Sequence, residues 1–218
     1  SLDFSSSSSS NRAGYWSGIA ERSVLTSDWT QATALSAQRN KKLRKMQRTI
    51  PLVHRVLRGD AARDEGFRQF CELEAMGWKG AAGSALKQSD KALAYASELV
   101  ASHAAKDTLA IDSLDDPQHS GNQSVAMVIS FEIAGRGVVW KIGHNTDYDA
   151  VSPGYQVILA ASGRFAAEGT PIWIDSLAGP EHPLVGWLWP QRFTVGTLMV
   201  PLKGSHAVAR TLSGIYQV

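Results

Sequence analysis

One segment in the second half of the sequence has the residue types of an anion site. Ser152 and Pro153 suit the N-cap and the first position of a helix. A helix N-terminus presents backbone N–H groups and the positive end of its dipole to an anion. The run of Ser152, Pro153, Gly154 and Tyr155 therefore predicts a phosphate cradle. The alternative is a capped helix start that binds only water.

Other familiar chemical patterns are missing from the sequence. No GxxxxGK[ST] or GxGxxG pattern is present, which argues against a P-loop enzyme and a Rossmann dinucleotide site. His119 and His182 lie near acidic residues, but without the spacing of HExxH or of cysteine pairs, so no metal site is predicted. Cys71 is the single cysteine, which excludes an internal disulfide and is predicted to be a buried helical thiol.

The elements around the candidate cradle predict how it is positioned. A strand at 138–143, a helix at 154–168 and a strand at 171–177 form a predicted β-α-β unit with parallel strands. Segment 124–133 alternates in polarity, and the turn at 134–137 leads back into 138–143, which indicates an antiparallel hairpin. A further short strand is predicted at 108–114.

The first half of the sequence predicts three helices. One runs from Ser27 or Asp28 to about Gln47, one ends at Gly77, and one covers roughly 89–105. Six cations crowd the second half of the first helix: Arg39, Lys41, Lys42, Arg44, Lys45 and Arg48. They form either a solvated basic face or a docking surface for an anionic carrier protein, nucleotide or tRNA.

Composition places limits on the class of protein. With 218 residues, 44% of them apolar, the chain suits one globular domain, and a net charge of +2 gives no general argument for nucleic acid. It has neither an apolar run of transmembrane length nor the order of a signal peptide, so we expect a soluble, cytoplasmic protein with no membrane span. Residues 1–23 are expected to be a flexible Ser-rich tail or linker and 24–218 the domain. A larger parent chain or a second domain would explain such a start. The aromatic group of Trp187, Trp189 and Phe193 favours core or an interface over a base-stacking platform.

Several short motifs occur together in the order of a known family. They are Leu73 to Gly80, Gly83 to Leu86, Trp140 to Gly143, Ser152 to Gly154 and the strand that ends in Asp175. This set, spread over roughly residues 30–190, resembles the GNAT superfamily of acyltransferases, in the branch of FemAB-like and cellulose-biosynthesis (CelD/BcsL-type) proteins.

The resemblance implies an α/β fold with a mixed sheet, in which two parallel strands splay apart, helices flank the sheet, and an acyl thioester lies between the strands. Residues 138–143 would be the first strand, with Lys141, Ile142 and Gly143 along the pantetheine arm, and 172–175 the second. The cradle at Ser152, Gly154 and Tyr155 would be the pyrophosphate loop. The family's usual R/Q-x-x-G-x-G/A loop is replaced here by residues 149–154, which provide fewer backbone amides.

Acyl transfer needs a base, a donor to the developing oxyanion and alignment of two substrates. His144 is the predicted base, because histidine changes charge near neutral pH and this residue lies just past the first strand. It departs from the family, whose members often carry Tyr there. Asp175 would orient an acceptor and Lys141 would bind the donor carbonyl or phosphate. A surface histidine, a strand-ending cap and a solvated lysine are the respective alternatives.

Four further residues are candidates for contact with the acceptor substrate. Trp78 and Lys79 would line the mouth of the site, and Glu132 and Tyr148 are additional polar candidates. The function implied is an N- or O-acyltransferase that uses acyl-CoA or a phosphopantetheine-bound acyl carrier protein, with no metal, in polysaccharide or specialised metabolite assembly. The alternatives are a non-catalytic interaction domain and a FemAB-like aminoacyl transferase that uses charged tRNA.

Overall fold

The computed structural model describes residues 15–118, 124–169, 173–179 and 181–200. The chain divides into a main unit, Ser23–Arg192, and a smaller one that combines Ser1–Arg22 with Phe193–Val218. The strands are β1 (Tyr15–Thr26), β2 (Val53–Arg58), β3 (Leu109–Asp115), β4 (Ser124–Ile133), β5 (Arg136–His144), β6 (Trp173–Asp175) and β7 (Gln191–Met199). The main helices are α2 (Ala37–Thr49), α4 (Phe67–Met76), α6 (Asp90–Ala104) and α7 (Pro153–Glu168). The shorter helical segments are α1 (Gln31–Ala34), α3 (Gly59–Ala61), η1 (Ala62–Gly66), α5 (Trp78–Ala81), η2 (Leu86–Gln88), η3 (Thr146–Val151) and α8 (Val185–Leu188).

The main unit is built on a mixed sheet in the order β2-β3-β4-β5-β6-β1, where β1 contributes Val24, Leu25 and Thr26. The pairs β2/β3, β3/β4, β4/β5 and β6/β1 are antiparallel, and β5/β6 is parallel. The predicted hairpin and the predicted β-α-β unit, made of β5, α7 and β6, are therefore confirmed.

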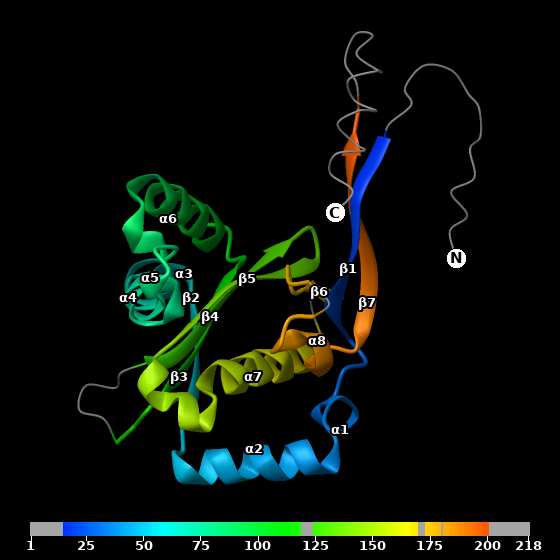
Figure 1. The fold of residues 1–218 in the computed structure, drawn as a ribbon. Coiled ribbons are helices and arrows are strands. Elements are labelled where there is room, and N and C mark those ends of the chain that lie inside the picture. Colours follow the sequence, from blue (N-terminus) through cyan, green and yellow to red (C-terminus); the bar gives the residue numbers. More distant parts are fainter. Residues whose placement is uncertain (1–14, 119–123, 170–172, 180, 201–218) are drawn as a thin grey trace. The chain divides into compact units, whose positions relative to one another are not determined.

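Strand β4 separates two apolar cores because its side chains alternate between the faces of the sheet. Met127 and Ile129 pack in the core with α4 and α6, and Ala126 and Val128 pack in the core with α7. Figure 1 shows α4 and α6 on one side of the central strands and α7 on the other. Both faces are covered, which explains why β4 is buried along most of its length.

The first predicted helix is wrong in detail, because the chain forms two helices there. Thr30 caps α1, and Ser36 caps α2 with its side chain accepting from the N–H of Arg39. The break follows from Leu35, which adopts an extended backbone and is buried in the core. A buried side chain thus outweighs a continuous run of helix formers. The third predicted helix is confirmed as α6, with Ser89 as its N-cap.

Two predicted helix ends differ in conformation. Gly77 follows α4, but with φ −85° and ψ −172° it is extended rather than left-handed. Ser152 precedes α7 in the left-handed region with φ 48°, and its side chain makes no capping hydrogen bond. Its carbonyl accepts from the N–H groups of Tyr155 and Gln156 instead. Gly169 ends α7 with φ 67°, as predicted.

The smaller unit contains the outer part of β1, which neighbours β7. Strand β1 begins at Tyr15, inside the segment predicted to be a linker, whereas 1–14 lie outside the described residues. The division of the chain at residue 23 stays a prediction.

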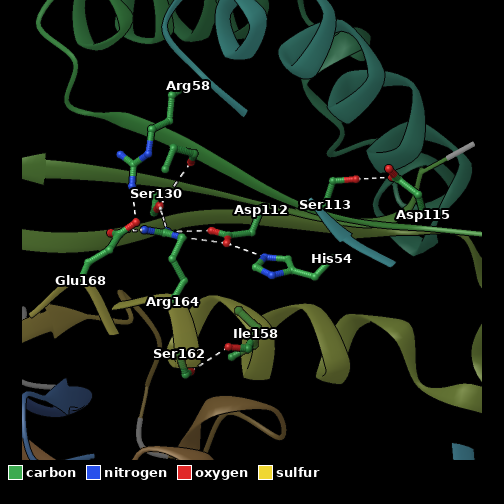
Figure 2. Close-up of polar contacts among 11 residues, drawn as sticks. His54, Arg58, Asp112, Ser113, Asp115, Ser130, Ile158, Ser162, Arg164 and Glu168 are labelled. Carbon is green, nitrogen blue, oxygen red and sulfur yellow. Dashed lines mark hydrogen bonds and ion pairs between the residues drawn. The ribbon is translucent and has the colours of Figure 1, made fainter. Parts of the chain in front are cut away.

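A buried ion network fixes α7 against the sheet. Asp112 on β3 has no exposed side-chain surface, and Arg164 of α7 donates to both of its oxygens, from Nε at 2.8 Å and from Nη2 at 2.7 Å. His54 of β2 donates from Nε2 to the same carboxylate at 2.9 Å. Arg164 also reaches Glu168, which pairs with Arg58. Figure 2 shows these side chains converging between β2, β3 and α7. The C-terminal half of α7 is therefore fixed to β2 and β3, while its first turn lies beside His144 at the end of β5.

Candidate active site

A cavity of about 530 Å³ opens where the parallel strands part. Strands β5 and β6 pair only at Gly137 with Ile174 and Val138 with Asp175. Beyond these pairs β5 continues to His144, whereas the chain after β6 turns away at Leu177, whose φ is 52°. Splayed parallel strands leave a gap in the sheet, and the cavity lies against the outer half of β5.

Residues from four parts of the main unit line this cavity. Helix α4 contributes Glu74, α5 contributes Lys79, and Gly77 lies between these two helices. The other lining residues are 139–144 of β5, Ile158 of α7, and Ser176, Leu177, Ala178, His182, Pro183, Leu184 and Val185 after β6. The lining is mainly apolar, with a few charged groups at one side. Such a cavity suits an extended apolar chain with one polar end.

A buried carboxylate holds two lysines at the wall of the cavity. Glu74 accepts from Lys141 Nζ at 2.9 Å and from Lys79 Nζ at 3.1 Å through Oε1. Its Oε2 accepts from the N–H of Leu86 at 2.9 Å. Lys79 Nζ also donates to the carbonyl of Ile142 on β5 at 2.9 Å. The cluster ties α4, α5 and β5 together and leaves both lysines partly exposed, at 19% and 21% of their side chains.

The charged groups in this cluster shift one another's pKa values. Burial alone would raise the pKa of Glu74, but the Leu86 N–H and the two lysines lower it overall. Burial lowers the pKa of Lys79, an effect that Lys141 adds to and Glu74 opposes. Glu74 is therefore ionised at neutral pH, and Lys79 loses its proton more readily than an ordinary lysine.

Two histidines reach the cavity with different nitrogen roles. His144 donates from Nε2 to Asp149 Oδ1 at 3.0 Å, so in its neutral form Nδ1 has the free lone pair. An added Cβ on Gly154 would lie 3.2 Å from this Nδ1, so the ring sits directly over the start of α7. His182 accepts at Nδ1 from the N–H of Leu184 at 3.3 Å, which places its proton on Nε2. Burial and then Lys79 lower the pKa of His182, which keeps it neutral.

A second, smaller cavity of about 180 Å³ lies at the start of α7. Its lining comprises Arg39, Lys42 and Met46 of α2, Ser152 and Tyr155, and Leu184. Tyr155 is buried, and burial raises its pKa to about 12, opposed by Arg39. Leu184 also lines the larger cavity, so the two share a wall.

The structure gathers most of the residues predicted from the sequence and leaves some apart. Lys79, Lys141, Ile142, Gly143 and His144 line the main cavity, and Ser152 and Tyr155 line the smaller one. Gly154 lies beside His144, which a Cβ at this position would meet at 3.2 Å. Their roles stay predictions.

Four predicted site residues are not among the described residues that line the main cavity. Asp175 is buried, and its Oδ1 accepts from the N–H of Leu177, an arrangement that fits the alternative of a strand-ending cap. Tyr148 donates its hydroxyl to Asp116 at 2.9 Å, and Glu132 lies at the exposed end of β4. Trp78 begins α5, but its side chain lies outside what the structure describes.

Sequence reasoning missed Glu74 and His182. Glu74 had a signal, because it stands four residues after Phe70 on the apolar face of α4, where an acid needs a buried partner. His182 had none, since it lies in an irregular segment after β6 and reaches the cavity only through the fold. Within the described residues no three or more His, Cys, Asp or Glu side chains gather as metal ligands. The helices in that part of the chain are all too short or too polar to cross a membrane.

The arrangement defines an α/β fold with splayed parallel strands and flanking helices, as predicted. A family model described as the acetyltransferase (GNAT) domain matches residues 36–182. The chain belongs to this family. The match covers β5, α7, β6 and the lining of the main cavity up to His182.

Solved structures with the same fold are distant in sequence. A conserved protein of unknown function from Bacteroides thetaiotaomicron matches with TM-score 0.53 and 15% identity, over 88% of this chain and 62% of its own. The C-terminal domain of a putative lysylphosphatidylglycerol synthetase from Agrobacterium fabrum matches with TM-score 0.56 and 9% identity, over 94% of this chain and 72% of its own. L-PGS from Bacillus licheniformis matches with TM-score 0.52 and 9% identity, over 95% of this chain and 67% of its own. The chain thus spans less than two thirds of the first protein. A search of curated proteins gives no match.

Proposed function

We propose that the main unit transfers an acyl group from a pantetheine thioester to an amine or hydroxyl. The observation that carries this proposal is the cavity between β5 and the chain after β6, whose volume of about 530 Å³ and mainly apolar lining suit an acyl-pantetheine arm. The thioester supplies an activated carbonyl, and the residues of this chain would hold and polarise it.

In the proposed reaction His144 is the base, and its Nδ1 takes the proton of the acceptor as the acceptor nitrogen or oxygen bonds to the carbonyl carbon. Asp149 fixes the ring and stabilises the imidazolium that forms. The carbon–sulfur bond then breaks, and the thiolate leaves and takes up a proton. His182 Nε2–H and the lysines held by Glu74 are the groups suited to stabilise the developing oxyanion.

The finer assignment rests on the motifs that resemble FemAB-like and CelD/BcsL-type proteins. In that branch an N- or O-acyltransferase would act in polysaccharide or specialised metabolite assembly, with acyl-CoA or an acyl carrier protein as donor. Asp175, Trp78, Glu132 and Tyr148 remain candidates for contact with the acceptor.

Donor binding is the first test, by thermal melting with CoA, acetyl-CoA, a long-chain acyl-CoA and a phosphopantetheinylated carrier protein. Saturation about 100-fold above the dissociation constant adds roughly 2.7 kcal/mol, which for this size of protein is a rise of about 5 to 10 °C. No rise with any donor would contradict the proposal and favour a non-catalytic interaction domain.

Catalysis is tested by release of CoA thiol from acetyl-CoA with a panel of amines and alcohols. Cys71 adds little background, because its thiol is buried and burial raises its pKa to about 11. We expect His144→Ala to lower kcat about 10²- to 10⁴-fold and to remove the acid-side loss of kcat that a protonated base causes. His103→Ala is the control, since His103 lies on α6 and bonds Thr108. An unchanged pH profile for His144→Ala would exclude it as the base.

Aminoacyl transfer from charged tRNA is a second candidate, which the exposed cations of α2 favour. The purified protein should then retain tRNA at low salt. Neutralising Lys41, Lys42, Arg44 and Lys45 together should abolish retention, and no retention by the unaltered chain would remove this candidate.

A further inference from the structure

The backbone at the start of α7 has few amides left for a phosphate. Pro153 has no N–H, and the N–H of Ser152 donates to the carbonyl of Asp149 at 3.0 Å. The N–H groups of Tyr155 and Gln156 donate to the carbonyl of Ser152 at 3.1 and 3.2 Å. Among residues 152–156 this leaves only the N–H of Gly154 for a phosphate, so the negative charge of the phosphate needs a further partner.

Helix α2 brings cations to the same place. Arg39 and Lys42 are three residues apart, which puts them on one face of the helix, and both line the 180 Å³ cavity with Ser152 and Tyr155. Neither α2 nor the described lining of this cavity contains an acidic residue. Figure 1 shows α2 next to α7, and Leu43 of α2 packs in the same core as α7. The helix backbone therefore holds Arg39 and Lys42 near Ser152, and their side chains are exposed to solvent.

The smaller cavity also adjoins the main one. Leu184 lines both, and α7 lines both, with Ser152 and Tyr155 at its start and Ile158 one turn later. A ligand with its acyl end beside β5 and its anionic end at the start of α7 would pass along the first turns of this helix.

We propose that Arg39 and Lys42 bind the phosphate end of the pantetheine donor. The inference rests on the proposed acyl-transfer function and adds to it the residues that replace a glycine-rich phosphate loop. Arginine can bind a phosphate with two parallel N–H donors, and lysine adds a point charge. The shared chemistry is a phosphoester next to pantetheine, as in CoA and in the prosthetic group of a carrier protein.

The experiment measures dissociation constants by calorimetry for CoA, 4′-phosphopantetheine and pantetheine at physiological salt. The variant is Lys42→Glu, with Lys42→Ala as a milder second variant. The matched control is Lys41→Glu, which makes the same change of charge on the next residue of α2, at an exposed position that lines neither cavity. Melting temperatures confirm that each variant is folded.

We expect Lys42→Glu to weaken CoA at least tenfold and 4′-phosphopantetheine by a similar factor, with Lys42→Ala between it and wild type. Pantetheine, which has no phosphate, should bind all variants within twofold, and Lys41→Glu should bind all three ligands like wild type. If CoA needs Lys42 and 4′-phosphopantetheine does not, the site reads the diphosphate of CoA rather than a carrier arm.

Equal losses in Lys42→Glu and Lys41→Glu would overturn the inference, because they would show a diffuse field rather than a site. Tight CoA binding that is unchanged in both Lys42→Glu and Lys41→Glu would also overturn the inference, although the proposed acyl-transfer function would then stand. Failure of wild type to bind CoA, 4′-phosphopantetheine and pantetheine would overturn both.

Discussion

Two buried carboxylates in the main unit are held in different ways. Glu74 and Asp112 both have fully buried side chains, and each is paired with two nitrogen-bearing side chains. The principal partner of Asp112 is Arg164 of α7, whose side chain is only 8% exposed and covers the carboxylate. The partners of Glu74 are two lysines that line a cavity. The Asp112–Arg164 pair is sealed from solvent, with His54 at its edge 31% exposed, whereas the Glu74 cluster faces a ligand-sized space.

The difference follows from the chemistry of the cations. The planar guanidinium of Arg164 makes two parallel hydrogen bonds to Asp112 and is fixed in orientation. An ammonium group on a flexible stem can exchange one partner for another without a large change of position. A sealed pair therefore positions α7, whereas the Glu74 cluster places two cations at the wall of the cavity.

The largest expected effect comes from breaking the sealed network. Asp112→Ala leaves Arg164 buried without its main counter-charge, and this should cost about 3 to 5 kcal/mol of unfolding free energy. Urea unfolding measures the loss. Ser130→Ala is the control, because it removes only a weak 3.4 Å contact with Arg164 and one neutral hydrogen bond to the carbonyl of Ala110. A loss below about 1 kcal/mol for Asp112→Ala would contradict a structural role for this network.

Opening the second cluster should cost less. Glu74→Gln keeps an acceptor for the Leu86 N–H but removes the charge that pairs with Lys79 and Lys141, so we expect about 1 to 2 kcal/mol. The partial exposure of both lysines limits the penalty, since water can solvate them. A loss as large as that of Asp112→Ala, measured in the same urea series, would show that the two clusters do not differ as described.

A glycine next to the Glu74 cluster offers a steric test. A Cβ on Gly143 would lie 3.3 Å from both Cα and N of Glu74, which are backbone atoms that cannot easily move. Gly143→Ala should cost about 1 kcal/mol or more by overpacking. Gly163 of α7 has open space around it, so Gly163→Ala should instead be neutral or stabilise by up to about 1 kcal/mol. Equal effects of the two changes on the melting temperature would contradict the close approach of β5 and α4.

The smallest effect is a pH dependence. Because the folded state lowers the pKa of Lys79, the unfolded chain binds more protons above that pKa, and stability should rise with pH up to about 10.4. Lys79→Met should flatten this rise in the pH range just below the ordinary lysine pKa. Lys41→Met is the control on an exposed helix. A slope identical in Lys79→Met and wild type would show that Lys79 does not carry it.

Local patterns predicted the elements that form the site, for reasons visible in single segments. The hairpin of β4 and β5 follows from two β-prone segments around a glycine turn, and α7 follows from Pro153 at its start and Gly169 at its end. The parallel arrangement of β5 and β6 follows from the handed connection through one helix. These features depend on residues close together in the chain.

Packing between distant segments decided what local patterns left open. The burial of Leu35 broke the first helix, and the pairing of Val24, Leu25 and Thr26 with β6 placed the end of β1 in the main sheet. His182 lines the cavity from an irregular segment, whose position cannot be predicted from helix or strand periodicity.

The sequence by itself determined the family, the β-α-β unit and the set of cations on α2. Only the tertiary structure decided that Glu74 meets both Lys79 and Lys141, and that Arg39 and Lys42 stand beside the start of α7. The physical reason is that periodicity and turn chemistry act within one element, whereas a buried charge finds its partner only after the sheet has brought separate elements together.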